Sequence, residues 1–259
     1  MPVKNDLNLL EPIYKALAHD GYTSGGADIT PTAWLDSPRI AQLMKTHRDE
    51  IEESVSDRVF SALGTGFHNI MENAVGDNAI TEERVFLDHP SGLRVSGAID
   101  LQIEKEDGTT ILVDYKVTGV YGVILNKKNG GVKPEWEKQL NSYRYLLQRA
   151  KDIKVSELYI LTMLRDWKAS LIGEELPLCT SDEMWERPEK FAVMKSSTHK
   201  RASRLLDSME EAIEWAADPT NGMDSKHVIE HRQGKRVRCE DWCKVAPFCS
   251  QYKEYVERA

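Results

Sequence analysis

The sequence has no long hydrophobic run and no excess of basic residues. No window approaches the run of about 18 apolar residues that a membrane-spanning helix requires. The first residues, MPVKNDLNLL, also lack the basic and apolar regions of a secretory signal peptide. The net charge is −8, so no overall positive field predicts nucleic-acid binding, although a site that holds divalent cations would itself concentrate carboxylates. We therefore expect a cytoplasmic protein with no membrane partner.

The composition is that of a globular protein. Of the 259 residues, 41% are hydrophobic and 29% are charged, and this length is ample for a hydrophobic core without disulfide bonds. Nothing in the sequence demands a second independent domain. We predict an N-terminal arm over residues 1–29 and a single domain over residues 30–259.

Hydrophobic periodicity predicts an α/β core. Helical spacing follows the start signal Asp36-Ser37-Pro38 and recurs later, whereas strand-like runs are separated by the turn sequences HPSG and KEDG. The predicted helices cover residues 38–51, 54–74, 134–150 and 199–218, and the predicted strands cover residues 82–89, 93–104, 109–118 and 157–164. The first three strands form an antiparallel meander, so the expected core is a central mixed sheet flanked by helices.

Two acidic residues stand on neighbouring predicted strands. Asp100 ends the run GAID, and Asp114 follows the apolar run ILV. Because these strands are antiparallel and joined by a tight turn, the two carboxylates can approach each other closely. Side chains two residues apart on a strand share a face, which places Lys116 beside Asp114.

This arrangement favours a divalent cation. Two carboxylates in one small site repel each other unless a cation lies between them, and carboxylate oxygens suit Mg²⁺ or Mn²⁺. With a lysine beside it, such an ion is suited to phosphodiester hydrolysis, because it can polarise a phosphate and activate a water molecule. The alternative is an ordinary cross-strand salt bridge between Asp100 and Lys116, with Asp114 only ending a strand.

The ordered set of motifs resembles the PD-(D/E)xK nuclease superfamily. Within it, the set is most similar to the RecB-like branch, which includes recombination nucleases, CRISPR-associated iron–sulfur exonucleases and phage proteins. The resemblance covers about residues 30–165 and the cysteine-rich tail, and it implies a restriction-endonuclease-like core. The motifs that carry it are Gly64-Thr65-Gly66-Phe67-His68 with Glu72, Gly97-x-x-Asp100, Asp114-Tyr115-Lys116 and Gln139-x-x-x-Tyr143.

The resemblance implies a role for each of these residues. Asp100 and Asp114 would bind the metal ion, and Lys116 would be the catalytic lysine. The metal ligands would also include His68 and the main-chain carbonyl of Tyr115, while Gln139 and Tyr143, on one helical face, would bind DNA. The alternatives are a structural role for His68 and a core position for Tyr143.

Three of the four cysteines stand close together in the sequence. Cys239, Cys243 and Cys249 have the spacing C-x3-C-x5-C. In an intracellular protein such a cluster is more typical of metal binding than of disulfide bonds. A four-thiolate site would also need Cys179, which would leave no cysteine unused.

In the RecB-like branch, this tail resembles the C-terminal cysteine cluster of [4Fe-4S] nucleases. It differs in its first gap of three residues and in the position of Cys179 after the core motifs. The resemblance implies an iron–sulfur cluster that clips a C-terminal helical segment onto the domain, with apolar tail residues such as Trp242 shielding it. The alternatives are Zn²⁺, a three-cysteine site completed by His227 or His231, and no metal.

Together these features predict a Mg²⁺- or Mn²⁺-dependent deoxyribonuclease, and an exonuclease rather than an endonuclease. Its expected role is recombination, repair or phage DNA processing in a bacterial or phage-infected cell, with DNA and a recombination or replication protein as partners. One alternative is a catalytically inactive member of the fold that binds nucleic acid or protein. Another is a metal-stapled structural module in which the carboxylates have no function.

Overall fold

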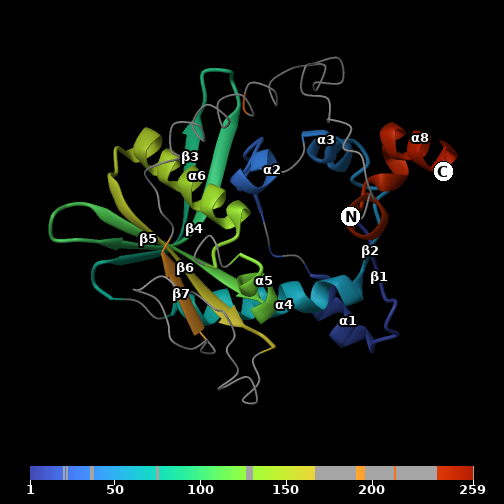
Figure 1. Ribbon diagram of the computed structural model, residues 1–259, viewed down its shortest axis with the longest axis horizontal. Coiled ribbons are helices and arrows are strands. Elements are labelled where there is room, and N and C mark those ends of the chain that lie inside the picture. Colours follow the sequence, from blue (N-terminus) through green and yellow to red (C-terminus); the bar gives the residue numbers. More distant parts are fainter. Residues whose placement is uncertain are drawn as a thin grey trace.

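A five-stranded mixed sheet forms the centre of the computed structural model (Figure 1). The strand order is β3-β4-β5-β6-β7, in which β5 and β6 are parallel and the other neighbours are antiparallel. The structure describes residues 1–19, 21, 23–35, 38–73, 76–126, 131–166, 191–195, 213 and 238–258. The strands are β3 (Ala79–Asp88), β4 (Arg94–Glu104), β5 (Thr110–Thr118), β6 (Val155–Leu164) and β7 (Phe191–Lys195).

Helices flank this sheet, and α4 and α6 make the main contacts with it. The helices are α1 (Glu11–Ala18), α2 (Pro31–Leu35), α3 (Pro38–Thr46), α4 (Val55–Glu72), α5 (Val120–Ile124), α6 (Pro134–Lys151) and α8 (Ser250–Arg258). A short parallel pair joins β1 (Val3–Lys4) to β2 (Glu53–Ser54). In the tail, a π-helical turn (Arg238–Trp242) and a 3-10 turn (Ala246–Phe248) precede α8. Among the described helices, none is both long and apolar enough to cross a membrane.

The sequence of α6 explains its limits. Pro134 occupies the first turn, where its fixed φ suits a helix and its missing N–H has no helical partner. Glu135 in the first turn and Lys151 in the last complement the helix dipole. Asp152 then takes a left-handed conformation with φ of 58° and ends the helix. This helix contacts β3, β4, β5 and β6 and so covers much of the sheet.

Gly97 allows α6 to approach β4 closely. A Cβ atom at this position would lie 2.9 Å from ring carbons of Tyr143 and 2.9 Å from Cδ1 of Leu146. Real Cβ contacts are essentially never this short, so a larger residue would push the helix away. The glycine of the Gly97-x-x-Asp100 motif therefore sets the distance between Tyr143 and the strand that carries Asp100.

The strands β4 and β5 part at one point of the sheet. Their ladder runs from Glu104↔Thr110 to Leu101↔Val113 and stops there. Further along β4, the N-terminal segment Asp28–Ile29 takes the place of β5: the N–H of Asp28 donates to the carbonyl of Arg94 at 2.8 Å. An isolated parallel bridge between Ile29 and Val95 belongs to the same contact. A fork in the sheet results, bounded by β5 on one side and by the N-terminal segment on the other.

The predicted α/β core is confirmed, with two kinds of difference. The helix predicted over residues 38–51 ends at Thr46, because a hydrogen-bonded turn follows in which the N–H of Glu50 donates to the carbonyl of His47. The edge strand β7 and the β1–β2 pair were not predicted, since two- and five-residue strands carry little periodicity. The predicted helix over residues 199–218 lies outside the described residues apart from residue 213, and the division into arm and domain stays a prediction.

Candidate metal centre

Asp100 and Asp114 meet at the fork between β4 and β5. Each is the first residue beyond the last ladder pair, Leu101↔Val113. Asp100 replaces the missing ladder contact with its side chain: Oδ2 accepts a hydrogen bond from the backbone N–H of Tyr115 at 2.6 Å. Both carboxylates are buried, with 7% of Asp100 and 1% of Asp114 exposed, and both line one cavity of about 360 Å³.

Burial and like charge act together on Asp100. Loss of hydration raises the pKa of its carboxyl group, and the nearby carboxylate of Asp114 raises it further, to about 7. His68, Lys116 and the N–H of Tyr115 oppose this rise only in part. A cation between the two carboxylates would remove their repulsion, so this electrostatic setting fits a divalent metal ion.

Lys116 is paired with Asp114. Its ammonium Nζ lies 2.6 Å from Asp114 Oδ2, which agrees with the expectation that the two side chains share a face. The alternative pairing of Lys116 with Asp100 is not found among the described ion pairs. The same Oδ2 atom of Asp114 is fully buried and accepts no hydrogen bond of normal geometry from the described residues, so a metal ion there would compete only with the Lys116 ammonium among the described ion pairs.

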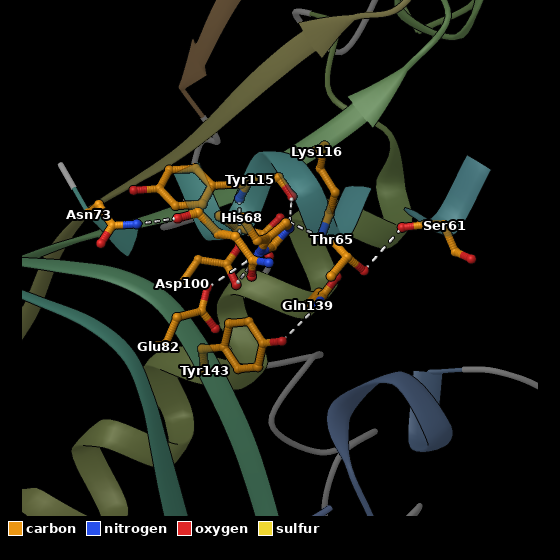
Figure 2. A network of polar contacts seen from close by, with 12 residues as sticks. Ser61, Thr65, His68, Asn73, Glu82, Asp100, Tyr115, Lys116, Gln139 and Tyr143 are labelled. Carbon is orange, nitrogen blue, oxygen red and sulfur yellow. Dashed lines mark hydrogen bonds and ion pairs between the residues drawn. The ribbon is translucent and has the colours of Figure 1, made fainter. Parts of the chain in front are cut away.

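His68 enters the site from α4, as Figure 2 shows. Its Nδ1 lies 3.5 Å from Asp100 Oδ1 and 3.4 Å from Glu82 Oε1, and its Nε2 lies 3.2 Å from the carbonyl oxygen of Tyr115. The hydrogen bond to Glu82 is the main cause of a raised His68 pKa, and the charge of Asp100 adds to it. Metal-binding histidines typically donate one ring N–H to a carboxylate, which fixes the orientation of the ring.

Glu82 completes this group, and the sequence analysis did not identify it. His68, Glu82 and Asp100 each offer one ligand atom, and these three atoms lie within 4.8 Å of one another. Glu82 has φ of 49°, a left-handed conformation that non-glycine residues adopt at a cost and that concentrates at functional sites. The carboxylate beside His68 thus comes from Glu82, whereas Glu72, on the same helix as His68, is exposed.

The β3–β4 hairpin register could have revealed Glu82. The closing pair of this hairpin is Asp88↔Arg94, and the antiparallel register continues to Glu83↔Ile99 and Thr81↔Leu101. Counting back along both strands from the HPSG turn places Glu82 opposite Asp100. The HPSG turn therefore predicts that Glu82 lies opposite Asp100, provided that the strands keep the register of the folded hairpin.

Gln139 and Tyr143 form another wall of the cavity. The side-chain amide Nε2 of Gln139 donates to the hydroxyl of Tyr143 at 2.7 Å, as expected for residues one turn apart on α6. The N-terminal segment supplies a further wall through Thr23, Thr30 and its neighbours. No function was predicted for this segment, because its position depends on pairing with β4 rather than on any local pattern.

The three tail cysteines are free and half-buried. The three sulfur atoms do not all lie within 4.8 Å of one another, but burial raises the pKa of the Cys243 thiol, and the thiols of Cys239 and Cys249 raise it further. A bound cation would relieve this effect, and thiolates suit both zinc and iron–sulfur clusters. Cys179, the predicted fourth ligand, and the alternative ligands His227 and His231 lie outside the described residues.

The tail is attached to α3 and β2. The ammonium of Lys244 lies 2.6 Å from Glu53 Oε1, and the ring of Phe248 stacks on His47 with centroids 4.2 Å apart. Arg39 also donates to the hydroxyl of Ser250 at the start of α8. Trp242 was expected to shield an iron–sulfur cluster from solvent, but 79% of this residue is itself exposed.

Comparisons with known proteins address the fold and the family. The family model of the PD-(D/E)XK nuclease superfamily matches residues 32–250. A solved structure titled "Crystal structure of SSO0001" is similar with a TM-score of 0.53 and 14% identity, over 92% of this chain and 91% of that chain, which is a likeness of fold alone. No curated protein matches. Because the family model spans well over half of the sequence, the chain belongs to the PD-(D/E)XK nuclease superfamily.

Proposed function

We propose that the protein is a metal-dependent DNA exonuclease of the RecB-like branch that acts in recombination, repair or phage DNA processing. The observation that carries the proposal is the placement of Asp100 and Asp114 at the fork between β4 and β5, with Lys116 beside them. Superfamily membership supports a nuclease, and the order of the motifs along the chain supports the finer assignment. A protein partner from recombination or replication belongs to the same proposal.

Four side chains and one backbone carbonyl would hold the metal. They are His68, Glu82, Asp100, Asp114 and the carbonyl of Tyr115. A divalent ion bound there would polarise the scissile phosphate and lower the pKa of a water molecule, and oxygen donors of this kind suit Mg²⁺ and Mn²⁺. The buried Asp114 oxygen without a hydrogen bond and the raised pKa of Asp100 support this fit.

Lys116, Gln139 and Tyr143 would act on the substrate. The Lys116 ammonium, held beside Asp114, is placed to orient the attacking water or to stabilise negative charge on the phosphate oxygens. Gln139 and Tyr143 form a linked donor pair on the cavity wall that can hydrogen-bond a phosphate or a base. These residues would therefore fix the position of the strand relative to the two aspartates.

A cleavage panel tests the nuclease proposal. Linear and circular DNA, each single- and double-stranded, would be incubated with the protein and Mg²⁺ or Mn²⁺. We expect metal-dependent cleavage that Asp114→Ala abolishes and that the control Asp107→Ala, at an exposed turn between β4 and β5, leaves intact. Absence of Asp114-dependent cleavage with either metal would contradict the enzyme proposal and favour an inactive binding subunit.

The same panel tests the exonuclease assignment. An exonuclease requires an end, so it should degrade linear DNA progressively and leave covalently closed circles intact. Fragments from closed circles would instead show internal cutting. In that outcome the nuclease proposal would stand and the exonuclease part would fail.

We also propose that the tail cysteines, with Cys179, bind a [4Fe-4S] cluster that attaches the tail to the domain. The C-x3-C-x5-C spacing of Cys239, Cys243 and Cys249 and their free thiols support a thiolate site. Anaerobically purified protein should be brown and contain about four iron atoms per chain, as the proposed cluster requires. Stoichiometric zinc without iron would overturn the cluster assignment and retain a metal site.

A further inference from the structure

A second cavity adjoins the proposed catalytic cavity. The two share the lining residues Thr30 and Thr32, at the start of α2. The second cavity has a volume of about 620 Å³ and is lined by residues of α2, α3 and the tail. Its remaining lining residues come from these three elements: Ala33, Ile40, Ala41, Met44, Arg238, Trp242, Cys243 and Lys244.

One side of this cavity is apolar and ends in an exposed aromatic ring. Ile40 and Met44, one turn apart on α3, supply much of the apolar surface. Trp242 faces the same cavity from the tail, and 79% of this residue is exposed. Covering a large exposed ring and the apolar surface beside it with a flat, apolar face lowers the free energy, because these surfaces leave water.

The charged groups of the cavity are basic. Arg238 and Lys244 line it, and none of the lining residues that the structure describes is acidic. Lys244 is paired with Glu53, but Glu53 is also bound by Arg58, so two cations share one carboxylate. Glu240 stands two residues before Trp242 in the sequence. Its side chain accepts a hydrogen bond from the hydroxyl of Tyr255 on α8. Two basic side chains therefore lie beside an apolar wall, and the exposed Asp241 precedes Trp242 in the sequence.

We propose that this second cavity binds a nucleotide of the single strand that extends from the catalytic cavity, with the base stacked on Trp242. Arg238 and Lys244 would lie near the phosphates of that nucleotide. This inference rests on the proposed function, because the strand is taken to run from the aspartates across Thr30 and Thr32. The two cavities are neighbours at Thr30 and Thr32, and Arg238 and Lys244 carry the charge opposite to that of the backbone.

The chemistry favours a single strand over a duplex. A base in a duplex is stacked on its neighbours and offers no free face to an indole ring, whereas an unpaired base does. Stacking is also tolerant of sequence, because every base has an aromatic face. The cavity thus suits a nuclease that holds any single strand at a fixed distance from the cleavage site.

The test measures affinity as a function of strand length. Labelled oligothymidylates of roughly 2 to 16 nucleotides, the range of typical single-strand site sizes, would be titrated by fluorescence anisotropy in the absence of divalent metal. The wild-type protein should gain affinity in a step at the length that reaches Trp242. Trp242→Ala should lose that step, which corresponds to about 5- to 150-fold in Kd for one stacked base.

Two further variants make the result specific. Trp242→Phe retains an aromatic face and should keep most of the step. Phe60→Ala removes another exposed aromatic residue, on α4, and should follow the wild-type curve. The proposal is overturned if Trp242→Ala follows the wild-type curve, if it weakens all lengths equally, or if it weakens blunt duplex DNA to the same extent.

This test is independent of turnover. If binding depends on Trp242 but no cleavage is detected, the nucleotide site is supported and the nuclease proposal is contradicted. Asp114-dependent cleavage with no effect of Trp242→Ala on binding would retain the nuclease and leave the cavity to a partner of another kind, such as a protein segment.

Discussion

The backbone of Tyr115 is engaged on both sides by side chains of the candidate metal centre. Its N–H donates to Asp100 Oδ2 at 2.6 Å, and its carbonyl oxygen lies 3.2 Å from His68 Nε2. These two contacts connect β5 to β4 and to α4 at the point where the sheet forks. The positions of Asp114 and Lys116, on either side of Tyr115, are therefore fixed by the backbone and not only by their own side chains.

Metal affinity should rise with pH and level off above about 7. Asp100 must lose its proton to bind a cation, and its pKa in the metal-free protein is about 7. Below this pH, the apparent association constant for Mn²⁺ should fall by up to about tenfold per pH unit for this one proton. His68, whose pKa is also raised, must be neutral to bind as well, so its proton adds to the fall. Calorimetric titration from about pH 5.5 to about pH 8 measures this, and a flat profile would contradict it.

Lys116→Met should separate cleavage from metal binding. Loss of the ammonium should lower the cleavage rate by about 10²- to 10⁴-fold, the range for general acid–base and electrostatic groups. Mn²⁺ affinity should be retained or improved, because Asp114 loses the cation that now competes for its Oδ2 atom. Lys105→Met, which removes a lysine paired with Glu157 at the far end of the β4–β5 ladder, is the control and should change neither quantity. A parallel loss of metal binding and cleavage would show that Lys116 has a structural role.

Glu82→Gln should weaken the metal site while preserving the shape of the side chain. The substitution removes a carboxylate that lies beside His68 and that is the main cause of its raised pKa. The His68 pKa should fall, as measured by NMR, and Mn²⁺ affinity should drop by about 10- to 100-fold. Glu72→Gln, at an exposed position on the same helix as His68, should change neither. Unchanged Mn²⁺ affinity in Glu82→Gln would exclude Glu82 from the site.

Gly97→Ala should destabilise the protein by about 1–3 kcal/mol, the usual cost of overpacking a tight core position. The added Cβ would lie 2.9 Å from Tyr143 and Leu146, so α6 or β4 must move. Gly64→Ala on α4 is the matched control, because a Cβ there meets no atom of the described residues within 4 Å. Its better helix propensity should stabilise the protein by about 0.5–1 kcal/mol. Urea denaturation compares the two, and equal stabilities would contradict the role assigned to Gly97.

The sheet and the aspartate pair could be predicted because their signals are local. Alternating apolar residues gave the strands, and two tight turns gave their antiparallel order. From this order follow the approach of Asp100 to Asp114 and the position of Lys116 beside Asp114, which the 2.6 Å ion pair confirms. The metal-binding and catalytic roles of these residues stay predictions.

Other parts of the site depend on contacts between distant segments. Glu82 becomes part of the site through its unusual φ and the exact hairpin register, which no periodicity encodes. The pairing of the segment Asp28–Ile29 with β4 connects residues more than sixty positions apart. The same holds for the second cavity, whose lining joins α2 and α3 to the tail near the other end of the chain.

The contact between the N-terminal segment and β4 bears on how the protein should be shortened for study. Family similarity begins at residue 32, and a fragment cut at this boundary would retain His68, Asp100 and Asp114. It would lose the stretch that pairs with β4 and, with it, the side of the cavity that contains Thr23 and Thr30. Such a truncated protein would keep the proposed metal ligands and expose them to solvent along an open edge, so its failure to retain DNA would say nothing about the chemistry of the intact protein.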